Sequence, residues 1–364
     1  PMGRTPAEAN SDGSPFQIVD SDSSWTRTSP MSSLFPLSHC RLARVLYIPG
    51  MLDSLLDKSV VGYTALGYRW RRHPRIESDL SGRVAVVTGA TSGLGRETAT
   101  ELARLGASVV IVGRNPEKTQ AVAESIREAT GNSAVTTQIA DLSSMAEIRQ
   151  LAARLEGPIH LLVNNAGVLL PERSETGEGL ETTFATNLLG HYLLTELLLE
   201  KLEPPARVIN VSSGGMYSQR LDVDDPQMQR GAYDGVAAYA KTKRAQIVLT
   251  ELWADALRDR GIVVHSMHPG WADTPGVSVS LPRFYKLTKP LLRTPAEGAD
   301  TIVWLCASEE AGQSTGHFWH DRKPRPTHRF KGTRETATER RRLVEQLSEL
   351  SGIAGSLSGP AVAG

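Results

Sequence analysis

The sequence has few cysteines, no excess charge of either sign and no long apolar run. Its 364 residues include two cysteines, Cys40 and Cys306, and forty Lys and Arg balance forty Asp and Glu. Two isolated cysteines exclude a disulfide framework and favour a reducing compartment, so we expect a cytoplasmic protein. The balanced charge argues against nucleic acid as a partner. No apolar run approaches the ~18 residues of a spanning helix, and no signal peptide is evident.

The N-terminal segments differ in composition. Residues 1–50 are rich in Ser, Pro, Asp and Thr without periodicity, and we expect a disordered leader. Residues 51–79 are predicted to form an N-terminal helical cap. Within it, 51–73 combines apolar side chains with a basic end, which suits either a helix in weak peripheral contact with a membrane or a helix packed on the domain. Packing is favoured, because Gly62 and Gly67 weaken a continuous amphipathic helix.

From residue 80 onwards, strand-like and helix-like segments alternate. Short β-branched runs predict strands at 83–88, 108–113, 134–140, 159–164, 206–212 and 262–267, and amphipathic stretches predict helices at 96–105, 116–130, 144–156, 180–202, 239–260 and 295–308. Such alternation predicts a single main α/β domain over 80–325, with a doubly wound parallel sheet of the Rossmann type and strand order 3-2-1-4-5-6-7. A C-terminal helix is predicted within 326–351, with its apolar face in 334–351, and the tail at 352–364 is expected to be flexible.

A glycine-rich turn joins the first predicted strand to its helix. Thr88-Gly89-Ala90-Thr91-Ser92-Gly93-Leu94-Gly95 lies between them, where backbone N–H groups and a helix N-terminus point at a phosphate. The first glycine permits the turn, the second lets the backbone approach a pyrophosphate, and the third lets helix pack on strand. The spacing G-x-x-x-G-x-G departs from G-x-G-x-x-G, so an ordinary turn is the alternative. The candidate cofactor-binding residues here are Gly89, Thr91, Ser92, Gly93, Leu94 and Gly95.

Two further strand ends supply candidate cofactor contacts. Gly113-Arg114-Asn115 ends the second strand, and the Arg114 guanidinium suits a ribose 2′-phosphate by charge and shape. This favours NADP over NAD, while a solvated surface arginine is the alternative. Asp141-Leu142 follows the third strand, where a carboxylate can accept a hydrogen bond from an adenine amino group. The competing interpretation is a helix N-cap at Asp141 or Ser143.

The fourth and fifth strands end in small and polar residues. Asn164-Asn165-Ala166-Gly167 ends the fourth strand at the edge where open α/β sheets bind ligands, although a simple turn would also explain it. Asn165, Ala166 and Gly167 are therefore candidate cofactor contacts. Ser212-Ser213 follows the fifth strand, and a hydroxyl there can hydrogen-bond a substrate oxygen.

Tyr239 and Lys243 open the next predicted helix and project from one face, four residues apart. An unperturbed tyrosine, with a pKa of about 10, is a poor acid–base catalyst near neutrality. Lowering that pKa to about 7 requires roughly 4 kcal/mol, which a nearby lysine ammonium in a partly desolvated cleft can supply. The pair alone is uninformative, and its order after the glycine turn and the strand-end serine makes it specific.

These motifs together resemble the single-domain branch of the short-chain dehydrogenase/reductase family over about 80–325. The matching segments are TGATSGLG, NNAG, the serine before the helix, YAKTK and His268-Pro269-Gly270-Trp271-Ala272-Asp273-Thr274. The resemblance makes Tyr239 the proton donor for carbonyl reduction, Lys243 its pKa partner and ribose ligand, and Ser213 the group that orients the carbonyl. It makes Asn187 a relay residue that holds a water against the lysine; satisfying backbone polar groups inside a helix is the alternative.

The resemblance also implies contacts around the cofactor and between subunits. Pro269, Gly270 and Thr274 would contact the nicotinamide side. Homodimers or homotetramers would form through the helices at 180–202 and 239–260. No metal site is implied.

The chain departs from the shorter family members between the catalytic serine and tyrosine. Residues 214–238 make 25, where those members have about a dozen, and we expect this insert to shape the substrate entrance together with 275–294 and 317–330. Trp271, Phe284 and Tyr285 suggest an apolar substrate, although each could serve packing alone. His268 is expected to be structural.

The predicted function is therefore an NADP(H)-dependent oxidoreductase. It would move hydride between nicotinamide and a small carbonyl or alcohol substrate. The alternative from another class is a catalytically idle NADP-bound scaffold or redox-sensing binding protein, against which the complete set of Asn187, Ser213, Tyr239 and Lys243 argues. A sugar-nucleotide epimerase would show G-x-x-G-x-x-G spacing and a large C-terminal domain, and the sequence has neither.

Overall fold

The computed structural model describes residues 59–280, 282–329 and 331–358. The predicted leader at 1–50 and the first residues of the predicted cap lie outside this range.

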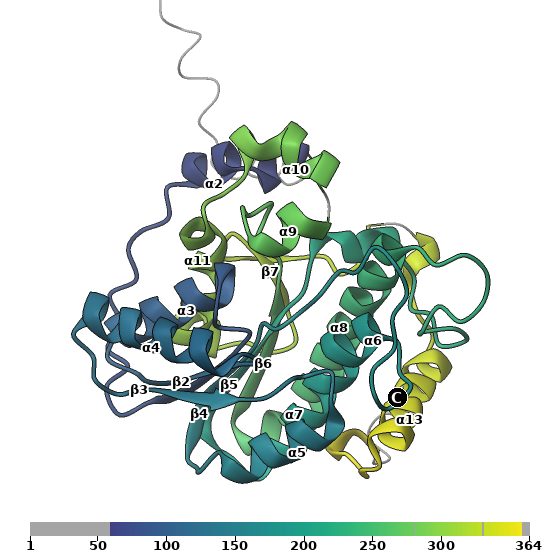
Figure 1. Cartoon of the computed structure of the whole chain (residues 1–364), viewed down its shortest axis with the longest axis horizontal. Helices are drawn as coiled ribbons and strands as arrows, with labels where there is room; N and C mark the ends of the chain where they lie inside the picture. Colours follow the sequence, from purple (N-terminus) through teal and green to yellow (C-terminus); the bar gives the residue numbers. More distant parts are fainter. Residues whose placement is uncertain (1–58, 281, 330, 359–364) are drawn as a thin grey trace, which may run out of the picture. The chain divides into compact units, whose positions relative to one another are not determined.

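The described strands form one eight-stranded sheet in the order β3-β2-β1-β4-β5-β6-β7-β8 (Figure 1). The strands are β1 (Val84–Thr88), β2 (Ser108–Gly113), β3 (Val135–Ile139), β4 (Ile159–Asn164), β5 (Leu202–Val211), β6 (Ile262–Met267), β7 (Phe318–His320) and β8 (Lys323–Arg325). All neighbours pair in parallel except β7 and β8. The predicted doubly wound Rossmann sheet is confirmed. The short antiparallel β8 adds an edge strand that its sequence, Lys-Pro-Arg, did not predict.

Helices cover both faces of this sheet. One face carries α3 (Gly93–Arg104), α4 (Pro116–Thr130) and α11 (Pro295–Ala307), and the other carries α5 (Met145–Arg154), α7 (Gly190–Leu198) and α8 (Gly235–Ala256). Side chains of β1 alternate between the two cores, with Val86 in one and Ala85 and Val87 in the other. Both faces of a parallel strand are thus buried, which explains its continuous apolar run.

The predicted helix at 180–202 is a series of shorter segments. These are α6 (Thr182–Phe184), the π-helical η2 (Ala185–Leu189), α7 and the 3₁₀ turn η3 (Leu199–Lys201). Residue Leu202 already begins β5, so this strand starts four residues earlier than the predicted 206. The π-helical turn matters for the site, because it lies at Asn187.

The described part of the N-terminal cap is a 3₁₀ turn, η1 (Val60–Tyr63), followed by a short helix, α2 (Ala65–Arg71). The chain bends at Thr64, which is extended and whose hydroxyl caps α2 by accepting from the Gly67 N–H at 3.5 Å. The segment packs on the domain, since the Trp271 N–H donates to the Tyr63 carbonyl at 2.7 Å. Among the described helices, none combines the length and the apolar character needed to cross a bilayer.

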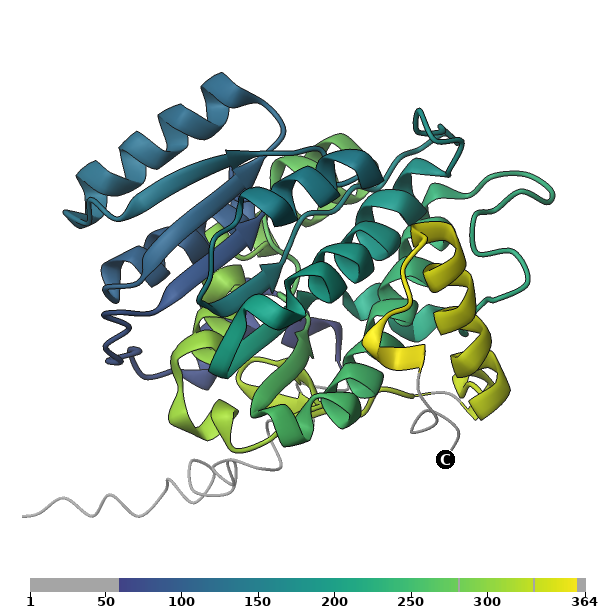
Figure 2. The same ribbon diagram turned by 90° about the horizontal axis from the view of Figure 1, so that it is seen from below.

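The C-terminal helix α13 (Ala337–Ser351) lies beside α7 and α8 (Figure 2). Its apolar side chains Leu343, Val344 and Leu347 are buried in the same core cluster as Tyr192 of α7 and Trp253 of α8. Helix α13 therefore covers part of α7 and of α8, the helices through which the resemblance implied that subunits would meet.

The segment after α13 differs from the flexible tail predicted at 352–364. A 3₁₀ turn, η8 (Ser356–Ser358), follows, Leu357 is 1% exposed, and the Ser356 N–H donates to Glu196 at 2.7 Å. One buried leucine and a carboxylate on α7 hold this part of the tail in place. Residues 359–364 lie outside the described range.

Candidate active site

The carboxyl ends of β1 and β4 are joined by Thr88 and Asn165. The Thr88 hydroxyl donates to the Val163 carbonyl and accepts from the Asn165 and Ala166 N–H groups, at 3.0 to 3.1 Å. The Asn165 amide donates to the carbonyls of Thr88 and Gly89 at 2.8 and 3.2 Å. The side chain of Asn165, predicted as a cofactor contact, therefore holds the glycine turn in shape.

The glycine turn leaves room that a side chain would fill. Gly89 and Gly93 have φ angles of 63° and 52°, in the region that favours glycine. A Cβ at Gly95 would lie 2.4 Å from the Gly89 carbonyl oxygen, so helix and strand can meet only at glycine. The N-cap Ser92 makes no side-chain cap hydrogen bond, which leaves first-turn N–H groups of α3 for an anion. These residues fit the pyrophosphate of a dinucleotide.

The predicted adenosine-side residues occupy different environments. Arg114 is exposed directly after β2. The Asp141 carboxylate accepts from the N–H and hydroxyl of Ser143, both at 2.8 Å. The N-cap of α5 is Ser144, so neither Asp141 nor Ser143 has the capping role considered as their alternative. Leu142 is 5% exposed, and its side chain packs in the core.

Tyr239 and Lys243 lie on one face of α8, as their spacing predicts, but in its second and third turns. The helix begins at Gly235, because Asp234 caps it by accepting from the Val236 and Ala237 N–H groups at 2.9 and 3.1 Å. The sequence interpretation placed this start at Tyr239 and overlooked the cap. The Lys243 ammonium lies 5.3 Å from the centre of the Tyr239 ring. Ser213 caps the 3₁₀ turn η4 (Gly214–Ser218), where its hydroxyl accepts from the Gly215 N–H at 3.1 Å.

Burial dominates the protonation of this pair. Lys243 is 2% exposed, donates to the Val211 carbonyl at 2.9 Å, and burial lowers its pKa to about 7. Burial raises the pKa of Tyr239, opposed by the Ser213 hydroxyl. From the sequence we expect a fully charged lysine to lower the tyrosine pKa. In the structure burial instead raises the pKa of Tyr239 and lowers that of Lys243. At neutral pH Tyr239 keeps its proton, and donating it requires a charge such as that of Lys243 to stabilise the phenolate left behind.

Asn187 connects the Asn-Asn-Ala-Gly segment to the lysine. In η2 its side-chain amide exchanges hydrogen bonds with the Val168 N–H and carbonyl at 2.8 and 2.9 Å. A Cβ at Gly167 would lie 3.3 Å from the Asn187 Oδ1 and 3.6 Å from the Lys243 ammonium, so the backbone passes close to both side chains. The Asn187 amide thus satisfies backbone polar groups, as the alternative interpretation proposed. These groups belong to Val168 rather than to the helix of Asn187 itself.

Two buried side chains behind Asn187 were missed by the sequence analysis. The Gln246 amide donates to the Asn187 backbone carbonyl at 2.6 Å and lies 2.8 Å from the His191 Nδ1. Burial and the charge of Lys243 lower the pKa of His191 to about 3. The sequence did offer a signal for Gln246, because it follows Lys243 by three residues on a predicted helix and so lies on the same face.

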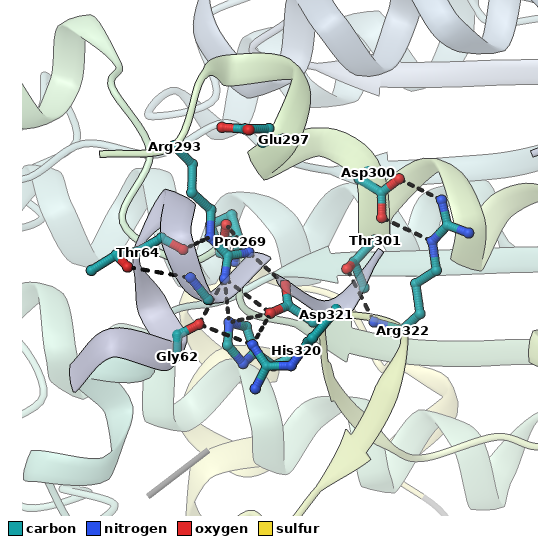
Figure 3. Close-up of polar contacts among 12 residues, drawn as sticks. Gly62, Thr64, Pro269, Arg293, Glu297, Asp300, Thr301, His320, Asp321 and Arg322 are labelled. Carbon is teal, nitrogen blue, oxygen red and sulfur yellow. Dashed lines mark hydrogen bonds and ion pairs between the residues drawn. The ribbon is translucent and has the colours of Figure 1, made fainter. Parts of the chain in front are cut away.

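A buried ion pair supports the segment Pro269–Thr274 from behind (Figure 3). The Arg293 guanidinium binds both oxygens of Asp321 at 2.5 and 2.9 Å, and Arg71 of α2 binds the same carboxylate at 2.5 Å. Arg293 also donates to the carbonyls of Gly62, Thr64 and Pro269, at 2.8 to 3.3 Å. We call Arg71, Arg293 and Asp321 the clamp.

The clamp determines the path of the predicted nicotinamide-side residues. Gly270 has a φ of 78°, and a Cβ there would lie 2.3 Å from the Arg293 Nε. The Arg293 N–H donates to the Trp271 carbonyl at 2.7 Å. Thr274 then reaches the glycine turn, since its Cγ2 lies 3.1 Å from where a Gly93 Cβ would stand. Pro269, Gly270 and Thr274 therefore follow β6 at the sheet edge that carries the turn, with Thr274 beside Gly93.

His268 is enclosed between aromatic rings. Its ring centre lies 5.1 Å from those of Tyr63 and His320, and neither ring nitrogen has a hydrogen-bond partner among the described residues. Burial lowers its pKa to about 3, so the ring is neutral. These contacts suit the structural role expected for it.

Aromatic side chains lie together at the segment where the substrate entrance was predicted. The Trp271 ring contacts Phe284 of α10 (Pro282–Thr288) edge-on, with centres 5.0 Å apart. Ser280, which ends α9 (Pro275–Ser280), donates to the Leu169 carbonyl at 2.6 Å. The insert at 214–238 is tied to α8 by the ion pair of Asp222 and Lys241 at 2.7 Å.

The sheet, the glycine turn at its carboxyl edge and the serine–tyrosine–lysine set define an NAD(P)-binding Rossmann oxidoreductase. The chain belongs to the short-chain dehydrogenase/reductase family: a family model described as short chain dehydrogenase matches residues 83–281.

Comparison with individual proteins extends this likeness. The chain is 43% identical over 305 residues to dehydrogenase/reductase SDR family member 12 of Bos taurus, covering 81% of this chain and 95% of the relative. It is 38% identical over 251 residues to retinol dehydrogenase 12 of Mus musculus, covering 67% and 79%. A short chain dehydrogenase of Shigella flexneri complexed with NADP is 28% identical, with a TM-score of 0.54, covering 68% of this chain and all of that one.

Proposed function

We propose that this oxidoreductase uses NADP(H) and acts on the carbonyl or alcohol group of a small apolar substrate. The observation that carries the proposal is the buried Lys243 beside the Tyr239 ring, with the Ser213 hydroxyl close enough to oppose the rise of the Tyr239 pKa, at the same sheet edge as the glycine turn. The nicotinamide, when bound, supplies or accepts the hydride.

The chain's own residues orient the substrate and move the proton. The Ser213 hydroxyl donates to the substrate oxygen and holds the carbonyl carbon open to attack. Tyr239 delivers its phenolic proton to that oxygen as negative charge develops there. Because burial raises the pKa of Tyr239, the proton is in place at neutral pH, but its transfer from so weak an acid requires a charge that stabilises the phenolate left behind. Lys243, whose buried amine has a pKa of about 7, is positioned to stabilise the phenolate that remains.

The replacement Tyr239→Phe tests this assignment. It removes the proton while keeping the ring, so turnover should fall by roughly 10²–10⁴-fold, the usual contribution of an acid catalyst. NADPH binding, followed by fluorescence titration, should change little. The matched control is Tyr233→Phe, which alters a tyrosine that hydrogen-bonds Glu181 at 3.0 Å. Persisting activity in Tyr239→Phe would remove Tyr239 from the role of acid.

The preference for NADP is proposed on Arg114. Its guanidinium is exposed at the end of β2, one residue beyond Gly113, where a Cβ would collide with Thr91 of the glycine turn at 2.5 Å. Arg114→Asp should lower kcat/KM with NADPH and raise it with NADH, shifting their ratio by about tenfold or more, since one charge-assisted contact to phosphate is lost. An unchanged ratio would exclude this contact.

The substrate class is proposed on Trp271 and Phe284 and on the names of similar proteins, which include retinol dehydrogenase 12. NADPH oxidation against a panel of retinals, steroid ketones, aliphatic aldehydes and quinones would test it. Failure of every class with cofactor bound would favour an idle scaffold or redox-sensing protein instead.

The remaining expectations concern location and assembly. We propose a cytoplasmic protein, since the buried Cys306 is a free thiol and Cys40 lies outside the described residues. We also propose a homodimer or homotetramer, as is typical of the family. Its interface must differ from one made by bare α7 and α8, because α13 covers part of both. Fractionation of cells and light scattering of the purified chain would test the two proposals.

A further inference from the structure

Most of the exposed large apolar side chains of the described chain gather on one surface. Seven such side chains are exposed among the described residues, and six belong to η1, α2, α10 and the 3₁₀ turn η6 (Lys289–Leu291). These six are Val60, Val61, Leu66, Trp70, Leu287 and Leu291, and we call them the α2–α10 surface. Leu287 is 83% exposed and Trp70 is 64% exposed. An apolar cluster of this kind marks an interaction site rather than a scatter of single residues.

The two halves of this surface are far apart in sequence but lie side by side (Figure 1). Both pack on Trp271: the Tyr63 ring stacks on one side at 6.3 Å, and Phe284 of α10 contacts it edge-on at 5.0 Å. The clamp joins them again, because Arg293, just beyond η6, donates to the Gly62 carbonyl of η1 at 2.8 Å. The surface is therefore a fixed feature of the domain.

The charged side chains of the two segments that form the surface are of one sign. Residues 59–72 and 275–293 together contain seven Lys and Arg and no Asp or Glu. Two of the seven are buried in the clamp, and Arg69 pairs with Glu297 of α11 at 2.6 Å. The others are exposed at the rim, namely Arg72, Arg283, Lys286 and Lys289. Two copies meeting through this surface would bring like charges together, whereas an anionic layer would complement them.

We propose that the α2–α10 surface docks the protein on an anionic lipid bilayer. Trp70 and Leu287 would enter the boundary between headgroups and acyl chains, and the rim lysines and arginines would lie at the lipid phosphates. Trp271 and Phe284, which line the predicted entrance, lie directly beneath. An apolar substrate could then pass from the bilayer to the crevice; that consequence rests on the proposed function, while the docking itself does not.

Vesicle binding of the full-length chain tests the proposal. We expect co-sedimentation with vesicles of phosphatidylcholine containing about one third phosphatidylserine, weaker binding to phosphatidylcholine alone, and release as salt is raised. Leu287→Glu should lower the partition coefficient by about tenfold or more, because an inserted apolar side chain becomes charged. Lys286→Glu should lower it by roughly fivefold or more, as each basic residue near the surface contributes about that factor.

The matched control is Val236→Glu, which alters the seventh exposed apolar side chain, on α8 and outside the surface. Its partition should equal that of the wild type. Trp70→Ser provides a second, independent variant in case Leu287→Glu unfolds, which circular dichroism would reveal. Equal binding by Leu287→Glu and the wild type, or no binding by the wild type, would overturn the proposal. So would a change in molecular mass of these variants without lipid, since that would indicate a subunit interface. NADPH turnover without lipid tests the proposed function separately.

Discussion

Lys243 and Arg293 are both buried cations of the same domain, yet their surroundings differ. Arg293 is 1% exposed, binds both oxygens of Asp321 and donates to three carbonyls. Lys243 donates to one carbonyl, and no carboxylate lies beside it among the residues with described positions. A satisfied buried charge stabilises one arrangement of the chain, whereas a poorly compensated one keeps a pKa near neutrality. The comparison separates a residue that holds the site from one that takes part in its chemistry.

Removing the clamp's carboxylate should have the largest effect, and that effect should be on stability. Asp321→Asn leaves Arg293 and Arg71 buried without their counter-charge, which typically costs about 3–5 kcal/mol. Urea denaturation should show the loss directly. Asp255→Asn is the control, because its partner Arg258 is 61% exposed and surface pairs contribute about 0–1 kcal/mol. Comparable losses in the two variants would show that the clamp is not a stabilising pair.

Lys243→Met should show the opposite pattern. Without the amine, stabilisation of the phenolate is lost, and we expect kcat to fall by roughly 10²-fold, about 2.7 kcal/mol in activation free energy. The unfolding free energy should hold or rise, since methionine fills the site without a charge to desolvate. Lys241→Met, at an ion-paired lysine two residues earlier, should retain activity. If Lys243→Met lowered the unfolding free energy but left kcat unchanged, Lys243 would be a residue that holds the site, like Arg293, and not one that takes part in the chemistry.

The same difference explains what the sequence could predict. The glycine turn, Tyr239 and Lys243 are local patterns, so their residue types and spacing point to their positions on strands and helices. Arg293 joins the Gly62 carbonyl of η1, more than two hundred residues away, to Asp321, 28 residues away, and no local pattern encodes such a pair. The start of α8 was misplaced for a simpler reason: the cap at Asp234 lies within the insert at 214–238, which had been assigned to the substrate entrance. The sequence therefore predicted the catalytic residue types but not the long-range polar contacts that hold the site.

The stabilities contributed by Lys243 and by Asp321 of the clamp should depend on pH in different ranges, the first above neutrality and the second in acid. Lys243 has a pKa of about 7 in the folded chain and, by reference values, about 10.4 when unfolded. Between these values the unfolded chain binds the proton that the folded chain lacks, so unfolding free energy rises with pH, by at most about 1.4 kcal/mol per unit. For Asp321 the arginines lower the pKa in the folded chain, so its contribution is present above the ordinary carboxyl range and is lost on acidification.

Urea denaturation of the wild type and Lys243→Met between pH 6 and about 9.5 tests the smaller of these effects. Because methionine does not titrate, the variant's advantage in unfolding free energy should be greatest near pH 6 and should shrink steadily above pH 7, as the wild type sheds its buried charge. Other titrating groups are common to both proteins and cancel in the difference. Parallel curves across the range would mean that Lys243 remains charged in the folded chain, and that its burial is compensated as fully as that of Arg293.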